Sequence, residues 1–70
     1  MTKTYVLIPV INGCELPIKR VATFADATRQ MDKILDRYNL QVADEVIYGN
    51  NDFGFKCTQY RTWIRIRAAA

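Results

Sequence analysis

The first third of the chain has the polarity pattern of a β-hairpin. Residues 4–11 are rich in β-branched and aromatic side chains, and the Asn12-Gly13 pair that follows tolerates the positive φ angles of a type I′ turn. A two-residue loop at this pair gives one almost wholly apolar face, which opposes Ile11 to Cys14, Pro9 to Leu16, Leu7 to Ile18 and Tyr5 to Arg20. The other face opposes Val10 to Glu15, Ile8 to Pro17 and Val6 to Lys19.

These pairings place the first strand inside a sheet, because it is apolar on both faces. The second strand is apolar on one face only and contains Pro17, so we expect it at an edge. Pro9 lacks the N–H that a ladder would use. A bulge or an early strand end is therefore predicted at Pro9.

Residues 24–38 have the periodicity of an amphipathic helix. Thr23 followed by Asp26 resembles an N-cap with an acidic third residue, and Asn39 is a candidate C-cap. Apolar residues recur at helical spacing: Phe24, Ala27, Met31, Ile34, Leu35 and Tyr38. The outward face carries charges of both signs three and four residues apart, which stabilise a helix modestly: Asp26, Arg29, Lys33, Asp36 and Arg37.

Two further hairpins are predicted after residue 40, from agreement in polarity between opposed residues. A turn around residues 49–52 opposes Tyr48 to Phe53, Val46 to Phe55 and Glu45 to Lys56. A turn around residues 58–61 opposes Phe55 to Ile64, Phe53 to Ile66, Lys56 to Trp63 and Gly54 to Arg65. Both hairpins place Phe53 and Phe55 on the buried side.

This order of elements predicts an α+β domain of the type ββαβββ. We expect residues 1–70 to form a single domain with a five-stranded antiparallel sheet, strand order 2-1-5-4-3, and one helix packed on one face. The three alanines 68–70 have no side chains to pack or bond. They are expected to be a frayed tail or a remnant of cloning.

Composition favours a cytoplasmic protein without a cofactor. The longest uncharged runs are far shorter than the roughly 20 residues that span a bilayer, and the N-terminus lacks a signal-peptide pattern. Cys14 and Cys57 match no metal-ligand spacing, and there is no histidine. We expect both thiols to be reduced and buried on the helix-covered side, and we expect no metal.

The sequence contains no arrangement that meets the requirements of an active site. Acid–base catalysis at neutral pH usually uses histidine or carboxylates in a recessed site. Asp44 and Glu45 are adjacent on a strand, so their side chains point to opposite faces. Neither cysteine has a histidine base. The chain is therefore predicted to be a binding protein and not an enzyme.

The most unusual pattern lies in the last predicted strand. Alternation places Arg61, Trp63, Arg65 and Arg67 on one face, with Lys56 as their cross-strand neighbour. No acidic residue follows Asp52, so this cationic strip adds four positive charges, more than the net charge of +3. The strip suits the phosphates of nucleic acid, with Trp63 stacked on a base, or an acidic protein surface. Alternatively, its arginines only keep the open face soluble, with Trp63 under their aliphatic stems.

The remaining candidate residues lie beside this strip and on the helix. Val6, Ile8 and Val10 are expected beside Trp63 as an apolar patch with a basic rim, a surface typical of an interface. On the helix, basic and acidic residues interleave, which is typical of a solvated face. The candidate partner-binding residues are Lys19, Arg29, Lys33, Lys56, Arg61, Trp63, Arg65 and Arg67.

Three segments carry a resemblance to a known family: residues 4–8, residues 22–27 with Arg29, and residues 51–56 with Trp63. With this order of elements, the chain resembles small phage-encoded anti-CRISPR proteins, in particular an inhibitor of type I-F systems. The resemblance implies a viral protein in the host cell cytoplasm that binds the backbone subunits of a crRNA-guided surveillance complex and blocks hybridisation of target DNA. Carried over by position, Arg29 and Lys56 are the contact residues. The Asn12-Gly13 turn and the C-terminal arginines depart from the family's pattern.

Two other functions remain open. The chain is alternatively a small basic nucleic-acid-binding protein that uses residues 61–67 directly. It is alternatively a structural module that forms a homodimer through the face of Val6, Ile8, Val10 and Trp63. None of the three functions involves a membrane.

Overall fold

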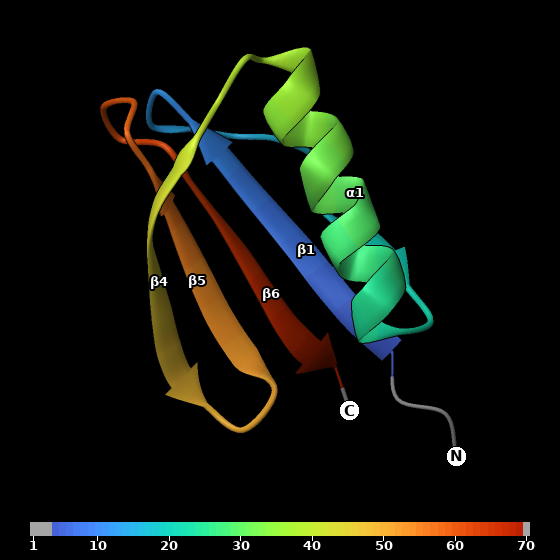
Figure 1. The fold of residues 1–70 in the computed structure, drawn as a ribbon. Helices are drawn as coiled ribbons and strands as arrows, with labels where there is room; N and C mark the ends of the chain where they lie inside the picture. The colour runs from blue at the N-terminus through green and yellow to red at the C-terminus, as the bar shows by residue number, and fades with distance from the viewer. Residues whose placement is uncertain (1–3, 70) are drawn as a thin grey trace.

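A computed structural model describes residues 4–69 and confirms the α+β class (Figure 1). The elements are β1 (Thr4–Ile11), β2 (Cys14–Glu15), β3 (Lys19–Val21), α1 (Phe24–Arg37), β4 (Val42–Gly49), β5 (Asp52–Cys57) and β6 (Trp63–Ala69). The sheet order is β2-β1-β6-β5-β4, and β3 pairs with the same edge of β1 as β2. The prediction that the last strand lies beside the first is confirmed. Residues 4–69 contain six strands and not five, because the predicted second strand is divided.

The division of the second strand changes its register. Ile11 lies opposite Cys14 as predicted, but Leu7 lies opposite Lys19 and not Ile18. One extra residue is accommodated in the segment between β2 and β3, where Pro17 cannot donate to a ladder. The shift turns Lys19 to the same side of the sheet as Leu7, which is the side that α1 covers.

Pro9 lies inside β1 without interrupting it. Its carbonyl accepts a hydrogen bond of 2.9 Å from the N–H of Leu16. Because the N–H and C=O of one strand residue point to the same side, the missing N–H falls on the edge where β2 ends. On its other side Pro9 lies opposite Ile64 of β6, and no ladder hydrogen bond is lost there. The predicted bulge or strand end at Pro9 is therefore wrong, and the irregularity lies in the partner strand.

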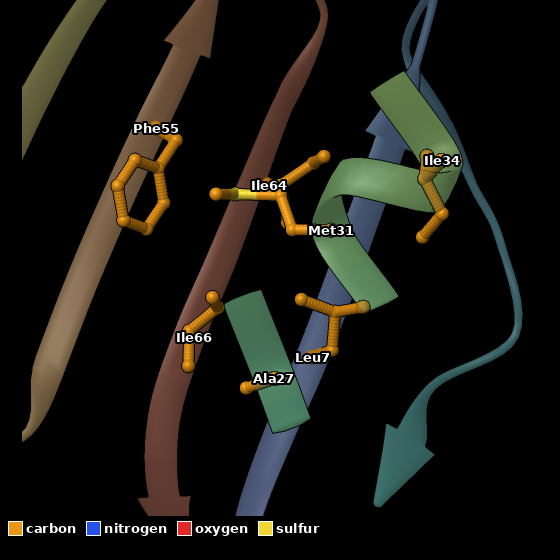
Figure 2. Packing of buried hydrophobic residues seen from close by; sticks show 7 residues of the cluster. All are labelled: Leu7, Ala27, Met31, Ile34, Phe55, Ile64 and Ile66. Atoms are coloured by element: carbon orange, nitrogen blue, oxygen red, sulfur yellow. The ribbon is translucent and has the colours of Figure 1, made fainter. Parts of the chain in front are cut away.

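The helix packs on β1 and β3 and closes the core (Figures 1 and 2). Its predicted N-cap is confirmed, because Thr23 Oγ1 accepts a hydrogen bond of 3.1 Å from the N–H of Asp26. The helix ends at Arg37 with Tyr38 as its C-cap, so the predicted C-cap at Asn39 is wrong by one residue; Asn39 follows in a left-handed conformation with φ 55°. The buried cluster consists of Leu7, Ala27, Met31, Ile34, Phe55, Ile64 and Ile66.

The two C-terminal hairpins differ in how well they were predicted. β5 and β6 pair as expected, with Phe55 opposite Ile64. β4 is shifted by one residue, which places Ile47 opposite Phe53 in the position predicted for Tyr48. The shift also places Val46 opposite Gly54, Glu45 opposite Phe55 and Asp44 opposite Lys56. The predicted pairs Val46 with Phe55 and Glu45 with Lys56 are therefore wrong.

Two smaller expectations need correction. Ala68 and Ala69 belong to β6, where the N–H of Ala68 donates to the carbonyl of Asn51 at 2.7 Å, so they are not a frayed tail; Ala70 lies outside the described residues. Both cysteines are free, but only Cys57 is buried. Cys14 is exposed, because it lies in the two-residue edge strand β2 and outside the buried cluster. Within residues 4–69, no helix has the length and apolar character needed to cross a membrane.

Candidate binding face of the sheet

The face of the sheet opposite α1 brings together most of the predicted cationic strip. Lys56 lies opposite Trp63 across the β5–β6 pair. On the other side of β6, Trp63 lies opposite Val10, Arg65 opposite Ile8 and Arg67 opposite Val6. This surface, called the open face below, carries Trp63, Arg65, Arg67, Lys56, Asp52, Gly54 and Tyr48, together with Asp44 and Val46 of β4, which lie opposite Lys56 and Gly54.

Arg65 is paired with an acidic residue that the sequence interpretation left out. Its Nε and Nη2 donate to the two carboxylate oxygens of Asp52 at 2.9 and 2.7 Å. The hydrogen bond from Arg65 lowers the pKa of Asp52 below its ordinary value of 3.8, although partial desolvation opposes this shift. The same hydrogen bond raises the pKa of Arg65. Asp52 therefore neutralises one of the four charges expected on the strip.

The Tyr48 ring holds Arg65 from a second direction. The guanidinium carbon of Arg65 lies 4.7 Å from the centroid of the ring, within the range of a cation–π interaction. The ring covers the backbone of Gly54, where an added Cβ would lie 2.7 Å from Tyr48 Cε2. A glycine at this position is thus what allows the ring to lie flat against β5 and reach Arg65.

The open face has a shallow depression beside an exposed indole. Tyr48, Gly54, Lys56, Trp63 and Arg65 line it together with Phe55, and its volume is about 280 Å³. Trp63 is 41% exposed, and Tyr48 is also exposed. Within residues 4–69, the arginines that stack on aromatic rings do so on tyrosines, and no guanidinium stacks on Trp63. The alternative in which Trp63 is a cation–π partner of these arginines thus gains no support from the described residues.

Arg61 does not belong to this face. It precedes β6 in the turn after β5 and has a left-handed φ of 49°. Its carbonyl accepts a hydrogen bond of 2.8 Å from the N–H of Gly13, and the N–H of Asn12 donates to Thr62 Oγ1 at 3.1 Å. The two turns are thereby tied together, and strand alternation does not extend to Arg61.

The predicted apolar patch is mostly buried. Val6 is 5% exposed and Val10 is 3% exposed, and only Ile8 between them is half-buried. Their neighbours in the sheet are the long side chains of Arg67 and Trp63, whose stems can cover apolar surface. A homodimer formed through Val6, Ile8 and Val10 would therefore bury little apolar area.

The other predicted binding residues lie on the opposite side of the sheet. Arg29 is exposed on α1 and pairs with Asp26 at 3.2 Å. Lys19 and Lys33 line a groove beside α1, together with Arg37. Arg29 and Lys56, the contact residues implied by the resemblance, are therefore separated by the sheet and the helix.

Comparison of the chain with protein families, with curated proteins and with solved structures found no match. The resemblance to type I-F inhibitors thus gains no support from these comparisons. Within residues 4–69, no three acidic or cysteine side chains are grouped so as to hold a metal ion. The open face is therefore the candidate binding site of the described residues.

Proposed function

We propose that the protein binds single-stranded nucleic acid, without catalysis, on the open face of its sheet. The observation that carries this proposal is the exposed indole of Trp63, on which no arginine of residues 4–69 stacks, with Lys56 directly opposite it on the neighbouring strand. An aromatic ring next to cations is how many proteins hold an unpaired base and its phosphate. Stacking on Trp63 requires a base that is not already stacked in a duplex, which favours single strands.

The surrounding residues fit distinct roles in this proposal. Lys56 and Arg67 are exposed and, within residues 4–69, form no ion pair within 4.0 Å, although Asp44 lies opposite Lys56 and Asp52 opposite Arg67. Both side chains can therefore reach phosphates. Arg65 is held by Asp52 and Tyr48 and supplies a rigid floor to the depression. The exposed Tyr48 ring offers a second surface for stacking.

Anisotropy of a labelled oligonucleotide tests the proposal, with single-stranded DNA and RNA and a duplex at two salt concentrations. Wild type should bind single strands more tightly than the duplex. Trp63→Ala should weaken binding by roughly tenfold, since stacking contributes about 1–3 kcal/mol per base. Lys56→Ala should reduce the slope of log affinity against log salt by about 0.7, the value for one phosphate contact on a single strand.

Arg29→Ala is the matched control, because it removes one exposed cation from the opposite side of the molecule. It should leave the affinity and the salt slope unchanged. Absence of binding to single strands at low salt, or equal losses from Arg29→Ala and Lys56→Ala, would refute the proposal.

A second candidate is the inhibitor of a crRNA-guided surveillance complex. What supports it is the presence of exposed cations on both sides of the sheet, which suits a protein that contacts a large protein–RNA surface from two directions. In that case wild type should bind the purified complex but not bare nucleic acid at physiological salt. Loss of complex binding in both Lys56→Ala and Arg29→Ala would favour this candidate over the first.

A further inference from the structure

A second basic site lies on the side of the sheet that carries α1. It is a groove of about 330 Å³ between the helix and the segment that joins β2 to β3. Its lining includes three cations, Lys19, Lys33 and Arg37. Its accessible apolar surface comes from Leu16, Pro17 and Tyr38, above the buried side chains of Pro9 and Ile34. Sequence reasoning treated these cations as parts of two unrelated surfaces.

The irregular edge of the sheet creates this groove. After Glu15 the N–H of Leu16 still donates to the carbonyl of Pro9, but Pro17 and Ile18 have no partner on β1 before the ladder resumes at Lys19. The one-residue shift then turns Lys19 toward the helix. A regular strand would instead point Lys19 to the open face, away from Lys33 and Arg37.

The charges in the groove are unbalanced. None of the residues that line it is acidic. Within residues 4–69, the three cations form no ion pair within 4.0 Å. Lys33 and Arg37 are four residues apart on one helix, an arrangement in which like charges repel. The helix dipole favours a cation in the last turn, which accounts for Arg37 but not for Lys33 or Lys19.

We propose that this groove binds a phosphate monoester that carries an apolar group. A phosphate monoester carries a charge of about −1.5 to −2 at neutral pH, which matches a cluster of three cations. Arg37 supplies a planar fork that suits two phosphate oxygens, and the lysines supply point charges. The accessible apolar surface of Leu16, Pro17 and Tyr38 gives the organic part of the ligand a surface to cover. The volume lies at the lower end of the roughly 300–1,000 Å³ of small-ligand pockets.

Titrations followed by two-dimensional ¹H–¹⁵N NMR test this site with three probes: phenyl phosphate, inorganic phosphate and benzoate. Phenyl phosphate should cause saturable shifts in the amide signals of residues 16, 18–20 and 30–38. Its affinity should exceed that of the other two probes severalfold, because only it combines the charge with the apolar body. Shifts centred on β5 and β6, no saturation at about 10 mM, or equal affinity for phenyl phosphate and inorganic phosphate would overturn the proposal.

The double variant Lys33→Gln, Arg37→Gln should keep the spectrum of the folded protein and lose at least about tenfold in affinity for phenyl phosphate. Arg29→Gln, on the same helix but outside the groove, should bind as wild type does. Unchanged affinity in the double variant would also overturn the proposal. Because Lys56 and Trp63 lie on the other side of the sheet, this result is independent of the nucleic-acid test.

Discussion

Replacement of Ile64 by alanine tests the packing of the core most directly. Ile64 is fully buried, with 0% of its surface exposed, and lies between Pro9 on β1 and Phe55 on β5 under the helix (Figure 2). Alanine lacks three of its carbons, which contribute about 2.4 kcal/mol at roughly 0.8 kcal/mol per buried methylene. The cavity that remains adds to this, so the expected loss is about 3–4 kcal/mol.

The size of this loss is large for so small a domain. At roughly 0.05–0.15 kcal/mol per residue, 70 residues give a total stability of about 3.5–10 kcal/mol. Ile64→Ala should therefore lower the melting temperature by about 12–32 °C or unfold the protein outright. If it unfolds, Ile64→Val provides a measurable step of about 0.5–1.5 kcal/mol.

Ile47→Ala is the matched control, since it removes the same three carbons from another strand of the same sheet. Ile47 is 74% exposed, so its replacement should change stability by less than about 0.5 kcal/mol. Urea unfolding followed by far-UV circular dichroism measures both variants. Equal midpoints for Ile64→Ala and Ile47→Ala would mean that the assignment of Ile64 to the buried core and of Ile47 to solvent is wrong.

Two further predictions concern titratable groups. A maleimide should label Cys14 rapidly in the native protein and Cys57 slowly, because burial hides Cys57 and raises its pKa above 9.0; equal rates would contradict the structure. The lowered pKa of Asp52 means that its pair with Arg65 stabilises the fold above pH 3.8, and that this contribution is lost as the pH falls through the lowered value. Asp52→Asn should accordingly be less stable than wild type at about pH 6, with a difference that shrinks toward pH 2, and a constant difference would argue against the pair.

The register of the β5–β6 hairpin was predicted correctly and that of the β4–β5 hairpin was not, for a physical reason. Both faces of β5 and β6 are constrained, because Phe55 and Ile64 must be buried while Lys56 stays in solvent, and their register was predicted correctly. β4 is an edge strand whose Ile47 and Tyr48 are both exposed. Burial therefore does not distinguish its two faces, and a slip of one residue exchanges them without an obvious penalty.

The candidate sites depended on contacts that no local pattern contains. Asp52 lies opposite Arg67 in the ladder but binds Arg65 on the diagonal, so alternation alone did not suggest the pair. Lys19 was assigned to the wrong face because a strict two-residue alternation does not allow for the extra residue between β2 and β3. The i, i+4 spacing of Lys33 and Arg37 was the one visible signal for the groove.

The central position of β1 and β6 sets the order in which the molecule can fold. Thr4 and Ala69 lie 65 positions apart in the chain, yet their strands pair in the middle of the sheet. Closing so long a loop costs conformational entropy before the core contacts form, so we expect folding in milliseconds to seconds, as in proteins rich in non-local pairings. During synthesis, one edge of β1 remains unpaired until β6 has been synthesised, whereas β4 and β5 can pair earlier as a local hairpin. A chain that stops before Trp63 should therefore expose two apolar strand edges and aggregate, and should not persist as a partial domain.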